Sequence, residues 1–358
     1  MSKRIGVVGC GNISDIYFTN LTGMFGKQVK VTALTDLIPE RAKKASEKYN
    51  IPYISKTSDL INSPETDIIL NITEPYNHYK VALETVKAGK HHYGEKPVCA
   101  KREEALEILK IAAEKKLLVG NAPDTFLGAG IQTCRKLLDD GWIGKPVAAT
   151  AFMVNHGHEH WHPGPEFYYK DGGGPMFDMG PYYLTALVNL LGPITRVSGS
   201  AKISFEKRTI TSEPLNGAVI NVDVPTHISG VMDFSSGAVG TIITSFDVYS
   251  HTLPCIEIYG SEGTLRVPDP NTFGGPVYVK RRMEENWSEI PLLKDYSANS
   301  RGLGLVDMAL AINEARPHRA CGELAYHILE VMHGFHDASS SGKYYDVKSS
   351  CERPEPLF

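Results

Sequence analysis

The sequence predicts an α/β protein with two domains. Residues 1–124 form a domain on a parallel sheet, and residues 125–358 form an α+β domain with a mainly antiparallel sheet. The length of 358 residues suits two domains of about 150 residues each. The first third of the chain alternates strand and helix patterns, and runs of β pattern take over near residue 125. These observations define the fold class.

In the N-terminal domain, a helix pattern follows most strand patterns. The helix expected over residues 103–115, for example, carries Leu106, Leu109 and Ala112 on one face. Strands joined through helices of this length require right-handed crossovers, so the sheet should be parallel. The expected strands are residues 5–8, 29–34, 66–71, 91–93 and 117–119, and the expected helices are residues 12–24, 40–49, 78–88 and 103–115.

In the C-terminal domain, β patterns dominate, and short glycine-containing turns join several of them. Residues 235–237 and 260–263 are turns of this kind, typical of hairpins, so this sheet should be largely antiparallel. The expected strands are residues 147–154, 194–205, 227–234, 237–246, 255–259 and 264–267. Helices are expected over residues 131–140, 181–191, 303–315 and 324–339.

Composition and charge exclude several classes of protein. With 42% hydrophobic and 22% charged residues, the chain is neither disordered nor fibrous. A net charge of −4 gives no electrostatic footprint for nucleic acid or an anionic membrane. There is no apolar run of about 18 residues and no signal-peptide pattern after Met1. We therefore expect a cytoplasmic protein.

The six cysteines, at positions 10, 99, 134, 255, 321 and 351, form no C-x-x-C pair. In a chain of this length they indicate separate reduced thiols and neither a disulfide framework nor a zinc site. Cys10 lies in the glycine loop considered next, where a small residue filling a tight turn is favoured over a reactive thiol.

A glycine loop follows the first expected strand and opens the first helix. Gly9 allows the tight turn, and Gly11 lets a pyrophosphate approach the backbone at the helix N-terminus, beside Asn12 and Ile13. Ser14 replaces the third glycine of the usual pattern but is small enough for close helix–strand packing. The position between strand and helix predicts a dinucleotide site, although a plain tight turn remains an alternative.

Asp36 ends the second expected strand, 25 residues beyond Gly11. A carboxylate there accepts hydrogen bonds from a ribose hydroxyl and repels a 2′-phosphate, which favours NAD over NADP. The alternative for Asp36 is a turn or N-cap residue. Arg41 could reach the adenine end or a 2′-phosphate, so NADP stays possible.

Four further segments carry a resemblance to a known family. They are Asn71–Pro75 with His78, Glu95–Pro97, the glycine-rich run Gly172–Tyr182, and Tyr259–Leu265. In this order they resemble the glucose–fructose oxidoreductase/inositol dehydrogenase (Gfo/Idh/MocA) family over essentially the whole chain. The resemblance implies an N-terminal Rossmann domain and a C-terminal domain with a large open sheet that commonly forms an oligomer interface. It also implies NAD(P)-dependent hydride transfer on sugars, cyclitols and related polyols.

The resemblance implies roles for particular residues. Lys96 maps onto the lysine that works near the nicotinamide, Glu95 onto a cofactor contact, and Asp178 onto the aspartate of an Asp-x-Gly motif. It also implies cofactor contacts at Thr73, Pro75 and His78. The chemistry agrees, because an ammonium stabilises the developing alkoxide and an aspartate can orient the substrate. Helix capping is the alternative for Asp178.

Tyr182 departs from the family pattern, which often has histidine there as the general base. An unperturbed tyrosine has a pKa of about 10 and is a poor base at neutral pH. Three alternatives stay open: Lys96 lowers the pKa of Tyr182, another histidine takes the proton, or the enzyme works mainly in the reductive direction with Tyr182 as the acid.

Histidine alternates at positions 156, 158, 160 and 162. In an extended chain these rings would share one face, which could bind a metal, but the family gives no reason to expect one. We expect a substrate loop, with Trp161 against a sugar ring and His158 and His160 as reserve bases. Ordinary structural histidines are the alternative, and no metal is expected. Glu166, Phe167 and Tyr168 extend the loop.

The sequence thus predicts an oxidoreductase acting on a ring hydroxyl or ketone of a sugar, cyclitol or glycoside, with NAD as cofactor and a homodimer or homotetramer as the assembly. Lys96, Asp178, Tyr182 and His158 are the catalytic candidates, and Lys96, His158, His160, Trp161, Asp178 and Tyr182 are the substrate contacts. Asp307 and His327 are further pocket candidates, although a structural role suits their segment better. The competing class is a non-catalytic regulator of the same fold that binds NAD(P) and sugar.

Overall fold

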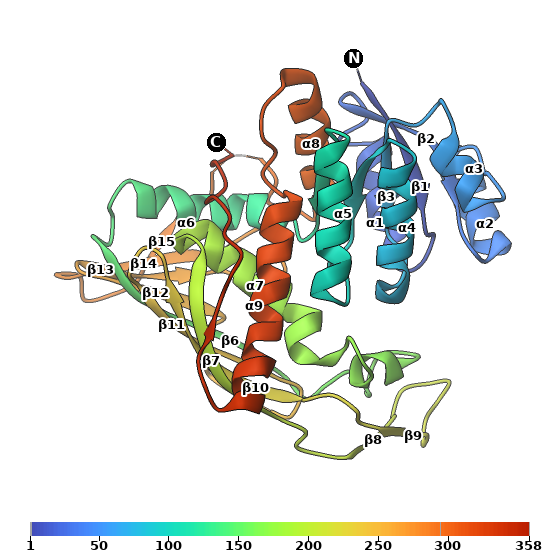
Figure 1. Ribbon diagram of the computed structural model, residues 1–358. Coiled ribbons are helices and arrows are strands. Elements are labelled where there is room, and N and C mark those ends of the chain that lie inside the picture. The colour runs from blue at the N-terminus through green and yellow to red at the C-terminus, as the bar shows by residue number, and fades with distance from the viewer. Residues whose placement is uncertain (1, 294, 358) are drawn as a thin grey trace. The chain divides into compact units, whose positions relative to one another are not determined.

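The computed structural model describes residues 2–293 and 295–357. The chain divides into two compact units (Figure 1). Unit 1 takes the chain up to Leu127 together with Asn299–Leu329, and unit 2 takes Gly128–Ala298 together with the chain from Glu330 onward. This differs from the boundary expected from the sequence, because residues 299–329, the returning segment, group with unit 1 and not with the rest of the C-terminal part.

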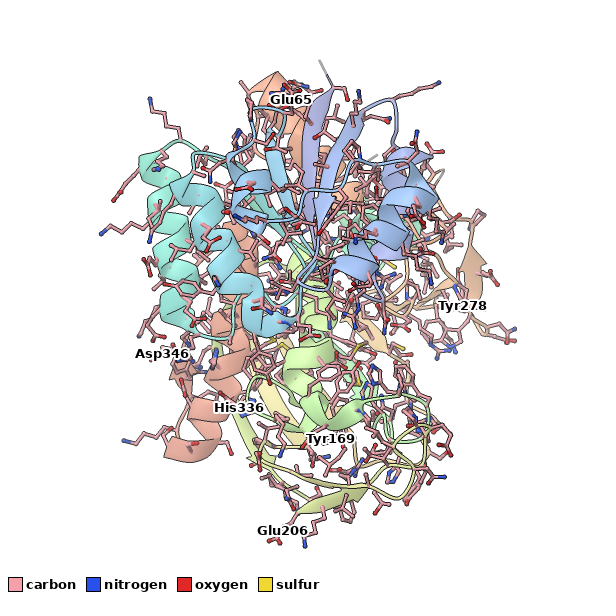
Figure 2. The ribbon with its side chains drawn as sticks, turned by 90° about the vertical axis from the view of Figure 1, so that its right-hand side faces the viewer. Glu65, Tyr169, Glu206, Tyr278, His336 and Asp346 are labelled. Carbon is pink, nitrogen blue, oxygen red and sulfur yellow. The ribbon has the colours of Figure 1, made fainter. Side chains whose placement is uncertain are left out.

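Unit 1 is built on a parallel sheet with the strand order β2-β1-β3-β4-β5. Its central strands are almost wholly buried, as expected of a parallel sheet covered by helices on both faces. Glu65, labelled in Figure 2, lies just before β3 and marks the end of the sheet at which that strand begins. The strands are β1 (Lys3–Val8), β2 (Val29–Thr35), β3 (Ile68–Asn71), β4 (His91–Gly94) and β5 (Val119–Asn121).

The helices of unit 1 agree with the expected ones except for an additional short helix, α3. This helix has only six residues, too few to show a clear helical period. The helices are α1 (Ser14–Thr22), α2 (Pro39–Tyr49), α3 (Thr57–Asn62), α4 (Pro75–Lys87), α5 (Arg102–Glu114) and the later α8 (Leu303–Glu314), with a short 3₁₀ turn, η1 (Thr125–Leu127).

Hydrogen bonds join the returning segment to the rest of unit 1. Asp124 Oδ2 accepts bonds from the backbone N–H groups of Gly302 (2.9 Å) and Gly304 (3.0 Å). Asn20 Nδ2 donates to the carbonyl oxygens of Asn299 and Arg301, each at 2.9 Å. The sequence pattern correctly gave α8 but held no information about which part of the chain it packs against.

Unit 2 is built on a mixed sheet with the order β15-β14-β13-β12-β6-β11-β10-β7-β16. Every neighbouring pair is antiparallel except β6 and β11, which confirms the expected mainly antiparallel sheet. The strands are β6 (Pro146–Val154), β7 (Ile194–Lys202), β10 (His227–Phe234), β11 (Val239–Ser245), β12 (Ile256–Gly260), β13 (Gly263–Val267), β14 (Val277–Arg281), β15 (Ser288–Ile290) and β16 (Tyr345–Asp346).

Helices cover one face of this sheet. In unit 2, α6 (Ala129–Asp139), α7 (Gly174–Leu191) and the part of α9 (Gly322–Ser341) from Glu330 onward lie on that face (Figure 1). On the opposite face the side chains are partly exposed, and many are apolar or small: Ala148, Thr150, Phe152, Val231, Thr241 and Ile243. An exposed sheet face of this composition fits a contact surface.

A two-stranded arm leaves the main sheet between β7 and β10. Its strands are β8 (Lys207–Thr209) and β9 (Val219–Asn221), and a short 3₁₀ helix, η2 (Pro165–Tyr169), lies in the same unit. Neither strand was expected from the sequence, because each has only three residues. Within residues 2–293 and 295–357, none of the helices combines the length and the hydrophobicity needed to span a bilayer.

Candidate functional site

The glycine loop between β1 and α1 has the geometry that its sequence predicts. Gly9 has φ +108°, a conformation that side-chain-bearing residues rarely adopt. A Cβ atom there would lie 2.7 Å from the carbonyl oxygen of Ile72, so only glycine fits. Cys10 fills the turn, and burial, with Asp36 nearby, raises the pKa of its thiol to about 12, which argues against a reactive thiolate.

Open space lies over Gly11, where a Cβ atom would meet nothing within 4 Å. Asn12 and Ile13 are exposed beside it, and helix α1 begins at Ser14. Ser14 is buried and donates its hydroxyl to the carbonyl oxygen of Gly11 at 2.7 Å, so the third position takes a small residue as expected. The loop therefore offers backbone N–H groups and room at a helix N-terminus, which suits a pyrophosphate.

Asp36 lies at the carboxyl end of β2 and is held against the glycine loop. Its Oδ2 accepts the N–H of Cys10 at 2.6 Å, and its Oδ1 accepts the N–H of Ile38 at 2.7 Å. The second bond is an Asx turn, so part of the alternative structural role for Asp36 is present. The fixed carboxylate is also suited to accept ribose hydroxyls. Arg41 is exposed on α2.

Glu95 and Lys96 follow β4 at the same edge of the sheet of unit 1. Glu95 is 9% exposed and accepts the hydroxyl of Tyr17 at 2.7 Å through Oε1 and the N–H of Lys96 at 3.0 Å through Oε2. Burial and the charge of Glu95 raise the pKa of Tyr17, which keeps that hydroxyl protonated as a donor. Lys96 itself is half-buried. Sequence reasoning missed Tyr17, since its position in α1 carries no sign of a contact 78 residues away.

His78 joins two loops at this edge. Its ring nitrogens lie 2.6 Å from the carbonyl oxygen of Pro97 and 3.0 Å from that of Thr73. Burial lowers its pKa, so the ring is neutral and can donate to one of the two carbonyls. Thr73 is half-exposed, and Pro75 occupies the first turn of α4. We infer that His78 braces these loops, and its direct contact with a cofactor stays a prediction.

Asp178 and Tyr182 lie one turn apart on α7, so their side chains share a face of the helix. The helix begins at Gly174, with Pro175 in its first turn and Pro181 in its interior. The expected start at residue 181 was therefore wrong. The capping alternative for Asp178 was also wrong, because the N-cap is Gly173. Tyr182 is 7% exposed.

His158 meets Asp178 in unit 2. Its Nε2 atom lies 3.4 Å from Asp178 Oδ2, and the residue is 7% exposed. The imidazole stacks on Tyr168, with ring centroids 3.8 Å apart and 17° between the planes, and meets Phe246 edge-on at 4.7 Å. An imidazole that faces a carboxylate and is held by aromatic rings can exchange a proton in a fixed orientation.

The other histidines of the segment have different surroundings. The chain turns at His158, whose carbonyl oxygen accepts the N–H groups of Trp161 (3.3 Å) and His162 (3.0 Å), so the extended arrangement that would place four rings on one face is not formed. His156 stacks on Tyr249, His160 is exposed, and Trp161 is 56% exposed. Among the described residues, no group of three or more His, Cys, Asp or Glu is arranged to hold a metal ion.

Asp307 forms ion pairs within unit 1. Its Oδ1 lies 2.9 Å from Arg316 Nη2, and its Oδ2 accepts the N–H of Arg319 at 2.7 Å. These bonds connect α8 to the turn before α9, which supports the structural role that the sequence favoured. His327, the other further candidate, is fully buried on α9.

Family comparisons agree with this geometry. Residues 3–122 match the model of an oxidoreductase family with an NAD-binding Rossmann fold, and residues 131–266 match the C-terminal domain of the GFO/IDH/MocA proteins. The chain is therefore an oxidoreductase of the Rossmann class. It belongs to the Gfo/Idh/MocA family, as the resemblance of its motifs implied.

Individual relatives have sequences only 16–30% identical to this chain in the aligned regions. An inositol 2-dehydrogenase/D-chiro-inositol 3-dehydrogenase of Lactiplantibacillus plantarum is 30% identical over 149 residues, 40% of this chain and 42% of that protein. Inositol 2-dehydrogenase 3 of Saccharopolyspora erythraea is 25% identical over 81% of this chain and 80% of its own length. A levoglucosan dehydrogenase in complex with NADH and L-sorbose shares the fold, with a TM-score of 0.84, 16% identity and coverage of 97% of this chain and 99% of that one.

Proposed function

We propose that the protein is an NAD-dependent dehydrogenase that acts on a ring hydroxyl, or on the corresponding ketone, of a sugar, cyclitol or glycoside. The observation that carries this proposal is the His158–Asp178 pair in unit 2, which supplies a base beside the family's aspartate. The glycine loop, Asp36 and the Glu95–Lys96 turn of unit 1 support the nucleotide part. Two of the relatives are named as inositol dehydrogenases, and inositol is a cyclitol, which supports the substrate class.

The glycine loop would hold the pyrophosphate of the cofactor, and Asp36 would hold the adenosine ribose. When bound, the nicotinamide supplies the hydride acceptor. For oxidation we assign the hydroxyl proton to the His158 imidazole, with the Asp178 carboxylate beside Nε2 stabilising the imidazolium that forms. For Lys96 we propose the role near the nicotinamide that the family resemblance implies, in which an ammonium stabilises the developing alkoxide. In the reductive direction the protonated His158 would return the same proton, and Tyr182, one helical turn from Asp178, is the alternative proton carrier for both directions.

NAD is the preferred cofactor in this proposal, because the Asp36 carboxylate would repel a 2′-phosphate. Arg41, five residues after Asp36, is exposed and could reach a 2′-phosphate. Tighter binding of NADP than of NAD is therefore the other outcome of the binding test. The protein is proposed to act in the cytoplasm, as its sequence suggests.

A homodimer or homotetramer is proposed from the exposed face of the large sheet. Phe152, Val231 and Ile243 are partly exposed there, on three neighbouring strands. Burying such a face would remove apolar side chains from water. Sedimentation equilibrium measures the assembly, and replacing Ile243 with Lys should shift it to the monomer.

The function is tested by mixing the purified protein with sugars, inositols and glycosides, with NAD and NADP separately, while recording nicotinamide absorbance. Turnover that is lost in Lys96→Ala and kept in Lys110→Ala supports the proposal, because Lys110 is an exposed lysine on α5. Retained binding of NAD by Lys96→Ala would show that the variant is folded. NAD binding without turnover on the whole panel would favour the non-catalytic regulator.

A further inference from the structure

Arg208 is a buried arginine that no motif and no family resemblance singled out. It lies on β8 of the arm and is only 6% exposed. Two carboxylates flank its guanidinium, Glu159 at Nε and Asp247 at Nη1, the latter at 3.0 Å. A charge so deeply buried is costly unless each donor is satisfied, so its position is strictly defined.

The remaining nitrogen of the Arg208 guanidinium, Nη2, donates hydrogen bonds to two backbone carbonyl groups. Its Nη2 atom donates to the carbonyl oxygen of Phe246 at 2.6 Å and to that of His156 at 3.2 Å. One side chain thus connects the arm, the segment after β11 and the loop that carries His158. The rigid fork of a guanidinium suits such a set of partners, whereas an ammonium could not satisfy them all.

The same loop is fixed from Glu159. Its carboxylate accepts the hydroxyl of Tyr169 at 2.7 Å as well as Arg208 Nε, and its carbonyl oxygen accepts the N–H groups of Thr211 and Ser212, each at 2.9 Å. Burial alone would raise the pKa of Glu159, but the bonds from Tyr169 and Arg208 lower it overall, so the carboxylate stays charged. Figure 2 labels Tyr169 and Glu206, the residue just before β8, in this part of unit 2.

The loop has little room to take another path. Gly157 has φ +81°, and a Cβ atom there would lie 2.2 Å from the hydroxyl oxygen of Tyr169 and 2.6 Å from Arg208 Nη2. The hydroxyl oxygen of Tyr169 also lies 3.4 Å from the backbone nitrogen of His158. The residue that carries the imidazole is therefore packed directly against the arginine network.

We propose that Arg208 is a positioning residue, which holds the loop so that the imidazole of His158 faces Asp178. The inference rests on the proposed function in assigning the proton transfer to His158. A purely structural arginine would affect stability alone. A positioning arginine also changes the rate of the chemical step, because a misplacement of about 1 Å at a catalytic group costs about 100-fold.

The test uses Arg208→Lys in the full chain, with Arg196→Lys as its control. Arg196 pairs with Asp233 on the exposed part of the main sheet and touches no residue of the His158 loop in the described contacts. We expect kcat to fall about 10- to 100-fold in Arg208→Lys with KM changed less than about 3-fold, and both to stay unchanged in the control. Arg208→Ala should regain part of its kcat when methylguanidinium is added. An unchanged kcat in folded Arg208→Lys would overturn the proposal.

A second measurement separates this proposal from the assigned activity. In protein labelled with ¹⁵N-histidine, the imidazole signals of His158, assigned by their loss in His158→Gln, report the ring's environment without any substrate. They should shift in Arg208→Lys and in Glu159→Gln but not in Arg196→Lys. If the His158 signals do not shift in Arg208→Lys, the positioning role is refuted, whether or not the enzyme is active on any sugar. If they shift but the wild-type protein turns over no sugar, the proposed function is wrong and the positioning role stands.

Discussion

Replacing either glycine of the nucleotide loop with alanine should separate the stability of the loop from its binding function. At Gly9, alanine would have to adopt φ +108° and place Cβ 2.7 Å from the carbonyl oxygen of Ile72. The backbone strain costs about 1–3 kcal/mol, and the displaced carbonyl adds to it, so we expect a loss of about 2–4 kcal/mol in all. Unit 1 should then unfold about 5–15 °C lower.

At Gly11 the expectation is different. A Cβ atom there meets nothing within 4 Å, so Gly11→Ala should unfold within about 2 °C of the wild type. The added methyl group would occupy the space proposed for the pyrophosphate. We therefore expect a Kd for NAD weaker by about 10-fold or more, equivalent to about 1.4 kcal/mol.

Calorimetry of unfolding and titration calorimetry with NAD measure the two effects on the same samples. Gly9→Ala should lose both stability and affinity, and Gly11→Ala affinity alone. If Gly11→Ala bound NAD as tightly as the wild type, the space over Gly11 would not hold the pyrophosphate. If Gly9→Ala kept its unfolding temperature, the strain expected from φ and from the Ile72 carbonyl would be refuted.

Two further predictions concern aspartates of unit 1. Asp36→Ser should lower the ratio of the dissociation constant for NADP to that for NAD by about 10-fold or more, because the carboxylate no longer repels a 2′-phosphate. Titration of the variant with both nucleotides measures this ratio. An unchanged ratio would leave Asp36 with its turn role alone. Burial raises the pKa of Asp124 to about 6 in the folded protein, above the value of about 3.9 in the unfolded chain. Between these two values the folded protein keeps the proton that the unfolded chain has lost. The free energy of unfolding therefore falls as pH rises from about 4 to about 6. About two pKa units correspond to roughly 3 kcal/mol, and Asp124→Asn should remove this part of the pH dependence in denaturant unfolding measured from about pH 4 to about pH 7. Parallel pH profiles for the two proteins would contradict the assignment.

Local signals in the sequence were enough for the fold class and for the nucleotide loop. The position of Gly9 after a buried strand and the distance to Asp36 follow from short-range geometry, so both features are predictable from the amino-acid sequence. The start of α7 could not be predicted in the same way, because either of two prolines could occupy the first turn of the helix. Pro175 occupies it, and Pro181 lies within the helix.

Long-range contacts explain the remaining differences. Arg208 contacts Glu159, 49 residues away, and belongs to a three-residue strand that has no recognisable pattern. The contact of His158 with Asp178 depends on a turn at His158 that no local pattern predicts, although both residues were candidates from the sequence. The catalytic roles of these side chains stay predictions, which the variants described above test.

The returning segment has a consequence for synthesis of the chain. The Asp124 carboxylate emerges from the ribosome 178 residues before its partner Gly302. At about 5–20 residues per second, that interval lasts roughly 10–35 s. During this time the nascent unit 1 has its parallel strands but lacks α8, and the whole of Gly128–Ala298 is made in between. Unit 1 can therefore finish folding only after the interposed unit 2 segment has emerged, so the nucleotide site should mature late in translation even though its glycine loop is among the first residues made.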